Sequence, residues 1–187
     1  MLEVLDSMAA ITMAIDHYLH GNPAGLTLGQ IVKTRIGVQK KLLLLPTAQD
    51  LHINVNTGSS LNPNLYECFR LTALIFSIAV IYPIPNTYAV LQTLVRELKD
   101  AIEVMDIESC GTRYSEGLLW MLVLGGIAAL GKPERDWFVS QLKFVGVEWL
   151  KLDWEGVEHI MRTLLWLDSA CSSGGRQLWD VVVKVPG

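Results

Sequence analysis

A cysteine and an arginine that could hold a phosphate group lie close together near the C-terminus. The segment reads Cys171-Ser-Ser-Gly-Gly-Arg176, and glycines between such side chains resemble a phosphate-binding loop. Phosphatase loops with a cysteine nucleophile place one residue more between the cysteine and the arginine than this segment does. We therefore expect the glycines to form a tight turn between two helices, with no catalytic role for Cys171.

Asp16, His17 and His20 form a second group with chemical potential. They lie within about one helical turn, and two histidines three residues apart could begin a zinc site. A zinc site needs at least one further ligand, and the neighbouring sequence offers none. The prediction is a polar helix end without a metal ion.

Paired carboxylates at helical spacing are the remaining candidates for acid–base chemistry. Glu97 with Asp100 and Glu155 with Glu158 have this spacing, which is more often that of a solvated helix face. The sequence contains no G-x-S-x-G and no G-x-x-x-x-G-K-[ST], and no G-x-G-x-x-G follows a strand. We predict that the chain is not an enzyme, and we assign no catalytic, cofactor-binding or metal-binding residue.

The tryptophans are unusually many and all lie in the C-terminal part of the chain. The favoured interpretation is core packing, in which each buried indole N–H finds an acceptor. The alternative is an aromatic-lined pocket for an apolar ligand. The six are Trp120, Trp137, Trp149, Trp154, Trp166 and Trp179.

The composition indicates a large core and a surface poor in charge. Apolar residues make up 51% of the chain and charged residues 18%, against about 45–50% and about 25% in typical domains. We expect some apolar surface to be covered by more of the polypeptide or by a protein partner, with a C2 homodimer as the commonest arrangement.

The charge argues against direct nucleic-acid binding. The net charge is −4 and the pI is about 5.5, whereas nucleic-acid binders usually carry a basic patch and a high pI. The densest basic group, which we interpret as a solvated helix face, comprises Lys33, Arg35, Lys40 and Lys41.

The cysteines and the N-terminus point to a reducing compartment. Cys68, Cys110 and Cys171 are odd in number and widely spaced, so they do not predict a disulfide framework. The first 20 residues lack a basic segment and contain Glu3, Asp6 and Asp16, which argues against a signal peptide.

Two apolar segments are expected at the centre of the fold. Residues 118–130 carry no charge, and a helix apolar on every face lies in a membrane or at the centre of a domain. The run between Gly117 and Gly131 is shorter than the roughly 20 residues of a membrane span. We predict a single all-α domain over residues 1–187, with about eight helices packed around helices 63–82 and 115–130 and no membrane contact.

The remaining elements follow from periodicity and helix-ending residues. Helices are expected over 2–19, 28–45, 87–105, from Pro133 onward, 153–165 and 176–183, with loops over 49–60 and 172–175. Gly125 and Gly126 inside the central helix indicate close approach of a neighbouring helix. Gly131 fits the left-handed residue that ends a helix.

Several segments together resemble the regulatory (middle-homology) domain of fungal zinc-cluster transcription factors. Each is weak alone, but their order and spacing over Leu65 to Trp179 match that family. The segments are Leu65-Tyr-Glu-Cys-Phe-Arg-Leu-Thr-Ala-Leu-Ile-Phe-Ser, Tyr82-Pro-Ile-Pro, Leu118-Leu-Trp-Met-Leu-Val-Leu-Gly-Gly-Ile-Ala-Ala, Pro133-Glu-Arg-Asp-Trp-Phe, Leu165-Trp-Leu-Asp-Ser-Ala-Cys and Gly174-Gly-Arg-Gln-Leu-Trp.

The resemblance implies an all-helical domain that regulates transcription through effector sensing or protein contacts, in the nucleus; without the resemblance, a cytoplasmic location is expected. In that family a six-cysteine zinc cluster reads DNA, and three scattered cysteines cannot form it. The chain is therefore a fragment of a longer factor or a short relative without a DNA reader. The alternative is a stand-alone helical module that binds a small apolar metabolite.

Overall fold

The computed structural model describes residues 1–21, 26–54, 62–83, 87–105 and 114–185. These residues form nine α-helices and two π-helical segments, without a strand among them, which confirms the all-α prediction. The elements are α1 (Leu2–Leu19), α2 (Leu28–Leu43), α3 (Ala48–Asn54), α4 (Pro63–Phe76), η1 (Ser77–Ile81), α5 (Tyr88–Val104), α6 (Ser115–Ala128), α7 (Arg135–Leu142), η3 (Lys143–Trp149), α8 (Trp154–Thr163) and α9 (Asp168–Val182).

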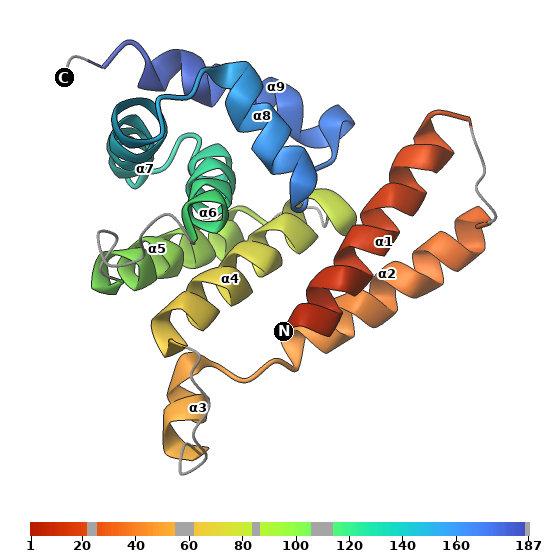
Figure 1. Cartoon of the computed structure of the whole chain (residues 1–187). Helices are drawn as coiled ribbons and strands as arrows, with labels where there is room; N and C mark the ends of the chain where they lie inside the picture. Colours follow the sequence, from red (N-terminus) through yellow and green to blue (C-terminus); the bar gives the residue numbers. More distant parts are fainter. Residues whose placement is uncertain (22–25, 55–61, 84–86, 106–113, 186–187) are drawn as a thin grey trace.

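Helix α6 lies at the centre of the body, as its uncharged sequence predicts. All residues from Leu118 to Gly126 are buried, and α4, α5, α7, α8 and α9 pack around the helix (Figure 1). The two interior glycines permit this approach. A Cβ on Gly125 would lie 2.4 Å from Phe138 Cε1, and one on Gly126 would lie 2.6 Å from Leu178 Cδ2. The predicted close packing at both glycines is confirmed.

The second central helix begins and ends where its sequence predicts. The Asn62 side chain accepts a hydrogen bond from the Asn64 backbone N–H at 3.0 Å, and Pro63 occupies the first turn, where its missing N–H is not needed. The helix continues through η1 to Ile81, and the chain then reaches Pro83. Residues 63–81 are long and apolar enough to cross a membrane, but 61% of that stretch is buried, as in a core helix.

Helices α1 and α2 form an antiparallel hairpin that packs beside the body rather than within it (Figure 1). A capping box starts α2: Thr27 Oγ1 accepts from the Gln30 N–H, and Gln30 Oε1 accepts from the Thr27 N–H. Ile31, Val38 and Leu42 make the buried stripe of α2.

The loop predicted over residues 49–60 is wrong in its first part, which forms helix α3. The Asp50 carboxylate accepts a hydrogen bond from the Thr47 N–H at 2.9 Å, and Thr47 Oγ1 accepts one from the Asp50 N–H at 3.2 Å. This reciprocal pair satisfies N–H groups that a helix start otherwise leaves unbonded. Residues 55–60 lie outside the described part of the chain, as does Cys110.

The turn predicted over residues 172–175 is also wrong, because α9 runs without interruption from Asp168 to Val182. The two glycines serve packing instead of chain reversal. A Cβ on Gly174 would lie 3.2 Å from Ile127 Cγ2, and one on Gly175 would lie 2.5 Å from Trp154 Cη2. Contact with neighbouring side chains therefore outweighs the weak helix propensity of this segment.

Helix α7 starts two residues later than predicted, at Arg135. Gly131 has a φ of 72°, the left-handed conformation expected after α6. The chain then makes a turn in which the Arg135 N–H donates to the Lys132 carbonyl at 3.2 Å. Pro133 lies in this turn and not in the first turn of α7.

Candidate functional site

The cysteine and the arginine that suggested a phosphate loop lie on a regular helix. Cys171 is buried in α9, and burial raises the pKa of its thiol to about 11. Arg176 is exposed and lies 3.7 Å from Asp180 one turn further on. A buried, protonated thiol and a solvated guanidinium cannot cradle one phosphate, so this segment is not a catalytic loop.

We expect Cys171 to react slowly with iodoacetamide at pH 7.5 in the folded protein. The raised pKa alone lowers its thiolate fraction about a hundredfold, since each pKa unit is a factor of ten. Burial adds to this protection. Peptide mapping after labelling in buffer and in urea measures the ratio directly; equal labelling in both would contradict the buried position.

The group of Asp16, His17 and His20 lies at the C-terminal end of α1. His20 Nδ1 is 2.8 Å from the Asp16 carbonyl oxygen and 3.4 Å from its carboxylate, and His20 is exposed. Asp16 and His17 border a hollow of about 270 Å³ together with Arg162 and Asp168. Within the described ranges, no three metal-ligating side chains of the His, Cys, Asp and Glu types are grouped.

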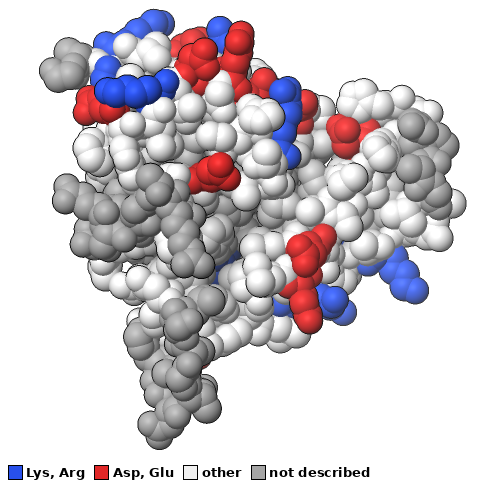
Figure 2. Space-filling view, viewed as in Figure 1, with Lys and Arg blue, Asp and Glu red and all other residues white. Residues whose placement is uncertain are grey.

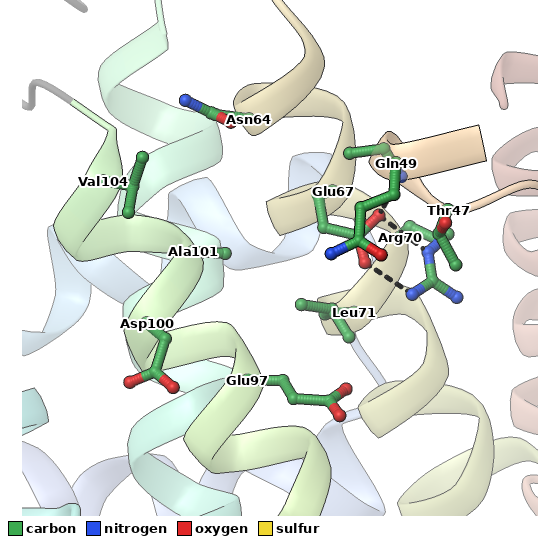
Figure 3. A pocket seen from close by; sticks show the side chains of 11 residues that line it. Thr47, Gln49, Asn64, Glu67, Arg70, Leu71, Glu97, Asp100, Ala101 and Val104 are labelled. Carbon is green, nitrogen blue, oxygen red and sulfur yellow. Dashed lines mark hydrogen bonds and ion pairs between the residues drawn. The ribbon is translucent and has the colours of Figure 1, made fainter. Parts of the chain in front are cut away.

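Glu97 and Asp100 border a hollow of about 520 Å³ between α3, α4 and α5 (Figure 3). The opposite wall carries an ion pair in which Arg70 Nε donates to Glu67 Oε2 at 3.0 Å. The hydrogen bond that Arg70 donates to the Glu67 carboxylate raises the pKa of the Arg70 guanidinium above its usual value.

Glu67 also fixes α3 to α4. Its Oε2 accepts a hydrogen bond from the Ala48 N–H at 3.0 Å, and the neighbouring Tyr66 hydroxyl donates to the Pro46 carbonyl at 2.8 Å. The charged wall of this hollow thus serves to hold two helices together.

The other carboxylate pair is solvated in part: Glu155 is exposed, and Glu158 is paired with Arg162 at 3.2 Å.

The tryptophans contribute to the core, and one of them also lines a cleft. Trp154, Trp166 and Trp179 are buried, and the Trp166 indole donates to Ser172 Oγ at 3.3 Å. Trp137 and Trp149 are partly buried. Trp120 is also buried, but it is among the residues that line a small hollow between α1 and the body.

We call this hollow the apolar cleft. Its volume is about 240 Å³, and its wall comes from α1, α4, α6 and the link from α8 to α9. The lining residues are Leu2, Leu5, Asp6, Ala9, Phe69, Trp120, Thr163, Leu164 and Leu165. Leu2 and Leu5 belong to the helix predicted over residues 2–19; the structure places both at the cleft, and Leu2 is 77% exposed.

A second apolar surface runs along α2, outside the hairpin. Leu28 and Leu43 are more than half exposed and Ile36 is 40% exposed, with Val32 partly exposed between them. This spacing places the four on one side of the helix, beside the buried stripe. We call these four residues the α2 stripe. The helix was predicted over residues 28–45, but periodicity alone does not show which of its apolar side chains other helices cover.

Basic side chains flank the α2 stripe. Helix α2 carries Lys33, Arg35, Lys40 and Lys41 and no carboxylate. The three lysines are exposed, as predicted for a solvated face, whereas the Arg35 guanidinium lies 4.8 Å from the centre of the Tyr82 ring. Lys and Arg atoms lie along the lower edge of the hairpin, over α2, in Figure 2.

Comparison with known protein families identifies the family of this chain. The family model of the fungal specific transcription factor domain matches residues 34–178, from within α2 into α9. Searches of curated proteins and of solved structures returned no match. The matched range includes both central helices and leaves α1 outside it.

Proposed function

The chain belongs to the fungal specific transcription factor domain family, and from that premise we propose that it regulates transcription in the nucleus through protein contacts made by the α2 stripe. The domain is a transcription-regulation module by family, and the family is not one of enzymes. The proposed protein contact rests on one observation, the α2 stripe together with the basic side chains that flank it.

The chemistry of this surface selects the type of partner. An amphipathic helix would place apolar side chains on Leu28, Ile36 and Leu43, as in other helix-in-groove contacts. Because α2 has four basic residues and no acidic one, acidic residues on that helix would meet opposite charge. Two copies of α2 laid together would instead bring like charges into contact, so a partner with acidic helices fits this surface better than a symmetric α2 pair does.

The binding test uses two designed amphipathic peptides with the same leucine face. One carries glutamate on its polar face and the other carries lysine. We expect the acidic peptide to bind the full chain about tenfold more tightly in fluorescence anisotropy, since each exposed ion pair contributes about 0.2–1 kcal/mol. The difference should shrink in high salt. Equal affinity for both peptides would argue against the charge-based choice.

A reporter assay connects this surface with transcription. Residues 1–187 are fused to a foreign DNA-binding domain, and the output of the fusion is compared with that of the DNA-binding domain alone. We expect the Ile36→Ser/Leu43→Ser double variant to lose most of the effect. Val104→Ser on α5 is the control, because Val104 is 70% exposed on another helix. A wild-type fusion without any effect would refute the proposed function.

A second candidate function is the sensing of a small apolar molecule. It is favoured by the apolar cleft, which reaches Phe69 on α4 and Trp120 on α6 and so touches both central helices. Self-association of the chain through its other exposed apolar side chains is a further proposal, and light scattering after size-exclusion chromatography tests it through the molar mass.

A further inference from the structure

Two aromatic residues, Phe69 and Trp120, line the apolar cleft, and we call them its floor. The rings of Phe69 and Trp120 lie 6.1 Å apart between centroids, with an angle of 28° between their planes. Both rings border the same small space, one from α4 and one from α6. Leu5 and Ala9 of α1 also line it.

The polar side-chain groups of Trp120 and Thr163 already form hydrogen bonds within the protein. Trp120 Nε1 donates to the Leu165 carbonyl at 2.9 Å, and the Thr163 hydroxyl donates to the Ile160 carbonyl at 2.8 Å. An apolar molecule can therefore cover these residues without leaving a donor unbonded. The cleft accordingly favours a ligand body that is apolar and flat.

Asp6 is the one ionisable residue among those lining the cleft. It is exposed, and its carboxylate has no hydrogen bond or ion pair to any side chain that the structure describes. A carboxylate without a partner at the edge of an apolar space accepts a hydrogen bond from an amine or a hydroxyl group and repels an anion. Asp6 therefore determines that the polar end of the ligand carries an amine or a hydroxyl group.

We propose that the apolar cleft binds a small aromatic amine, whose ring lies against Phe69 and Trp120 while its ammonium group reaches Asp6. The inference deepens the second candidate function above and rests on the domain being regulatory. A volume of about 240 Å³ is slightly below the usual range of about 300–1,000 Å³ for small-molecule sites, so a single ring with a short side chain suits it.

Such a ligand would also connect the hairpin with the body. Leu2, Leu5, Asp6 and Ala9 belong to α1, whereas the rings belong to the two central helices. A molecule that contacts both parts at once stabilises the arrangement in which they are closed on each other. Because α2 follows α1 in the hairpin, binding of the ligand at the cleft would affect the position of the α2 stripe.

The test measures binding of 2-phenylethylamine, 3-phenylpropionate and ethylbenzene to the full chain by titration calorimetry and ligand-observed NMR. We expect the amine to bind about two- to fivefold more tightly than the carboxylate, the ratio that one exposed ion pair gives. In Asp6→Asn the affinities of the amine and the carboxylate should converge. Absence of binding by all three compounds would overturn the proposal.

Two phenylalanine variants on adjacent residues of α1 locate the site. Ala9 lines the cleft, so the ring of Ala9→Phe should fill it and lower the affinity for the amine at least tenfold. Ala10 is exposed and does not line the cleft, so Ala10→Phe should bind like the wild type. Circular dichroism confirms that both variants fold.

Two outcomes distinguish failure of the proposed ligand site from failure of the proposed function. Equal binding by both phenylalanine variants overturns the cleft as the site, whatever the reporter shows. Binding that follows the expected pattern, with a reporter fusion that has no effect, supports the site and refutes regulation by this domain. Nuclear Overhauser contacts from the ligand to an indole ring that disappear in Trp120→Phe would confirm the floor.

Discussion

Replacing Gly175 with valine is expected to lower the free energy of unfolding by about 3 kcal/mol, near the upper end of the usual cost of overpacking. A Cβ at this position would lie 2.5 Å from Trp154 Cη2 and 3.0 Å from Trp166 Cη2. Both indole rings are buried, and a fused ring cannot bend away from a close contact. One of the two rings, or α9 itself, would have to move.

Gly37 provides the matched control for this substitution. It also lies within a helix, but a Cβ there would meet no other atom within 4 Å. Gly37→Val should therefore change the free energy of unfolding by less than about 0.5 kcal/mol, because valine and glycine differ only slightly in helix propensity. Urea unfolding of both variants, followed by circular dichroism, gives the two values. Similar losses would show that the tryptophans do not confine Gly175.

The same glycine shows where reading from sequence reaches its limit. Gly174-Gly175 after two serines favours a turn when only local preferences are considered. The contacts that keep the helix straight come from Trp154, Trp166 and Ile127, which lie on other segments of the chain. A glycine inside a helix costs about 1 kcal/mol relative to alanine. This cost is smaller than the packing free energy that the two glycines permit, so a prediction based on neighbours in sequence failed there.

The central helices could be predicted because their signals are local and extreme. Residues 118–130 lack charge altogether, and Asn62-Pro63 combines a capping side chain with a proline at the first helical position. Helix α3 was missed because one pair, Thr47 with Asp50, starts it within a polar stretch.

The candidate sites could not be predicted, since they depend on tertiary arrangement. The apolar cleft joins residues of α1 to rings sixty or more and more than a hundred residues away in sequence. Periodicity predicts a helix over residues 2–19, but it cannot tell which of its apolar side chains, such as Leu2 and Leu5, a neighbouring helix covers. The same holds for Ile36 and Leu43, which differ from the buried Leu42 only in the direction they face.

Replacing Leu122 with alanine should lower the free energy of unfolding by about 3–5 kcal/mol, the largest effect expected for a conservative truncation in this chain. Leu122 is fully buried in the middle of α6, and its neighbours from Leu118 to Gly126 are buried as well. Because helices pack on every side of α6, no solvent-facing side chain can fold inward to fill the space. The cavity term therefore adds to the lost transfer free energy.

Leu130 is the control for this truncation, since it lies at the end of the same apolar segment and is 58% exposed. Leu130→Ala should change the free energy of unfolding by no more than about 0.5 kcal/mol. If Leu122→Ala is too unstable to purify, Leu122→Val gives a smaller loss, which urea unfolding can still measure against that of Leu130→Val. Equal losses at the two positions would mean that α6 is no more central to the protein than the exposed residue that follows it, and the arrangement of the other helices around α6 would then be wrong.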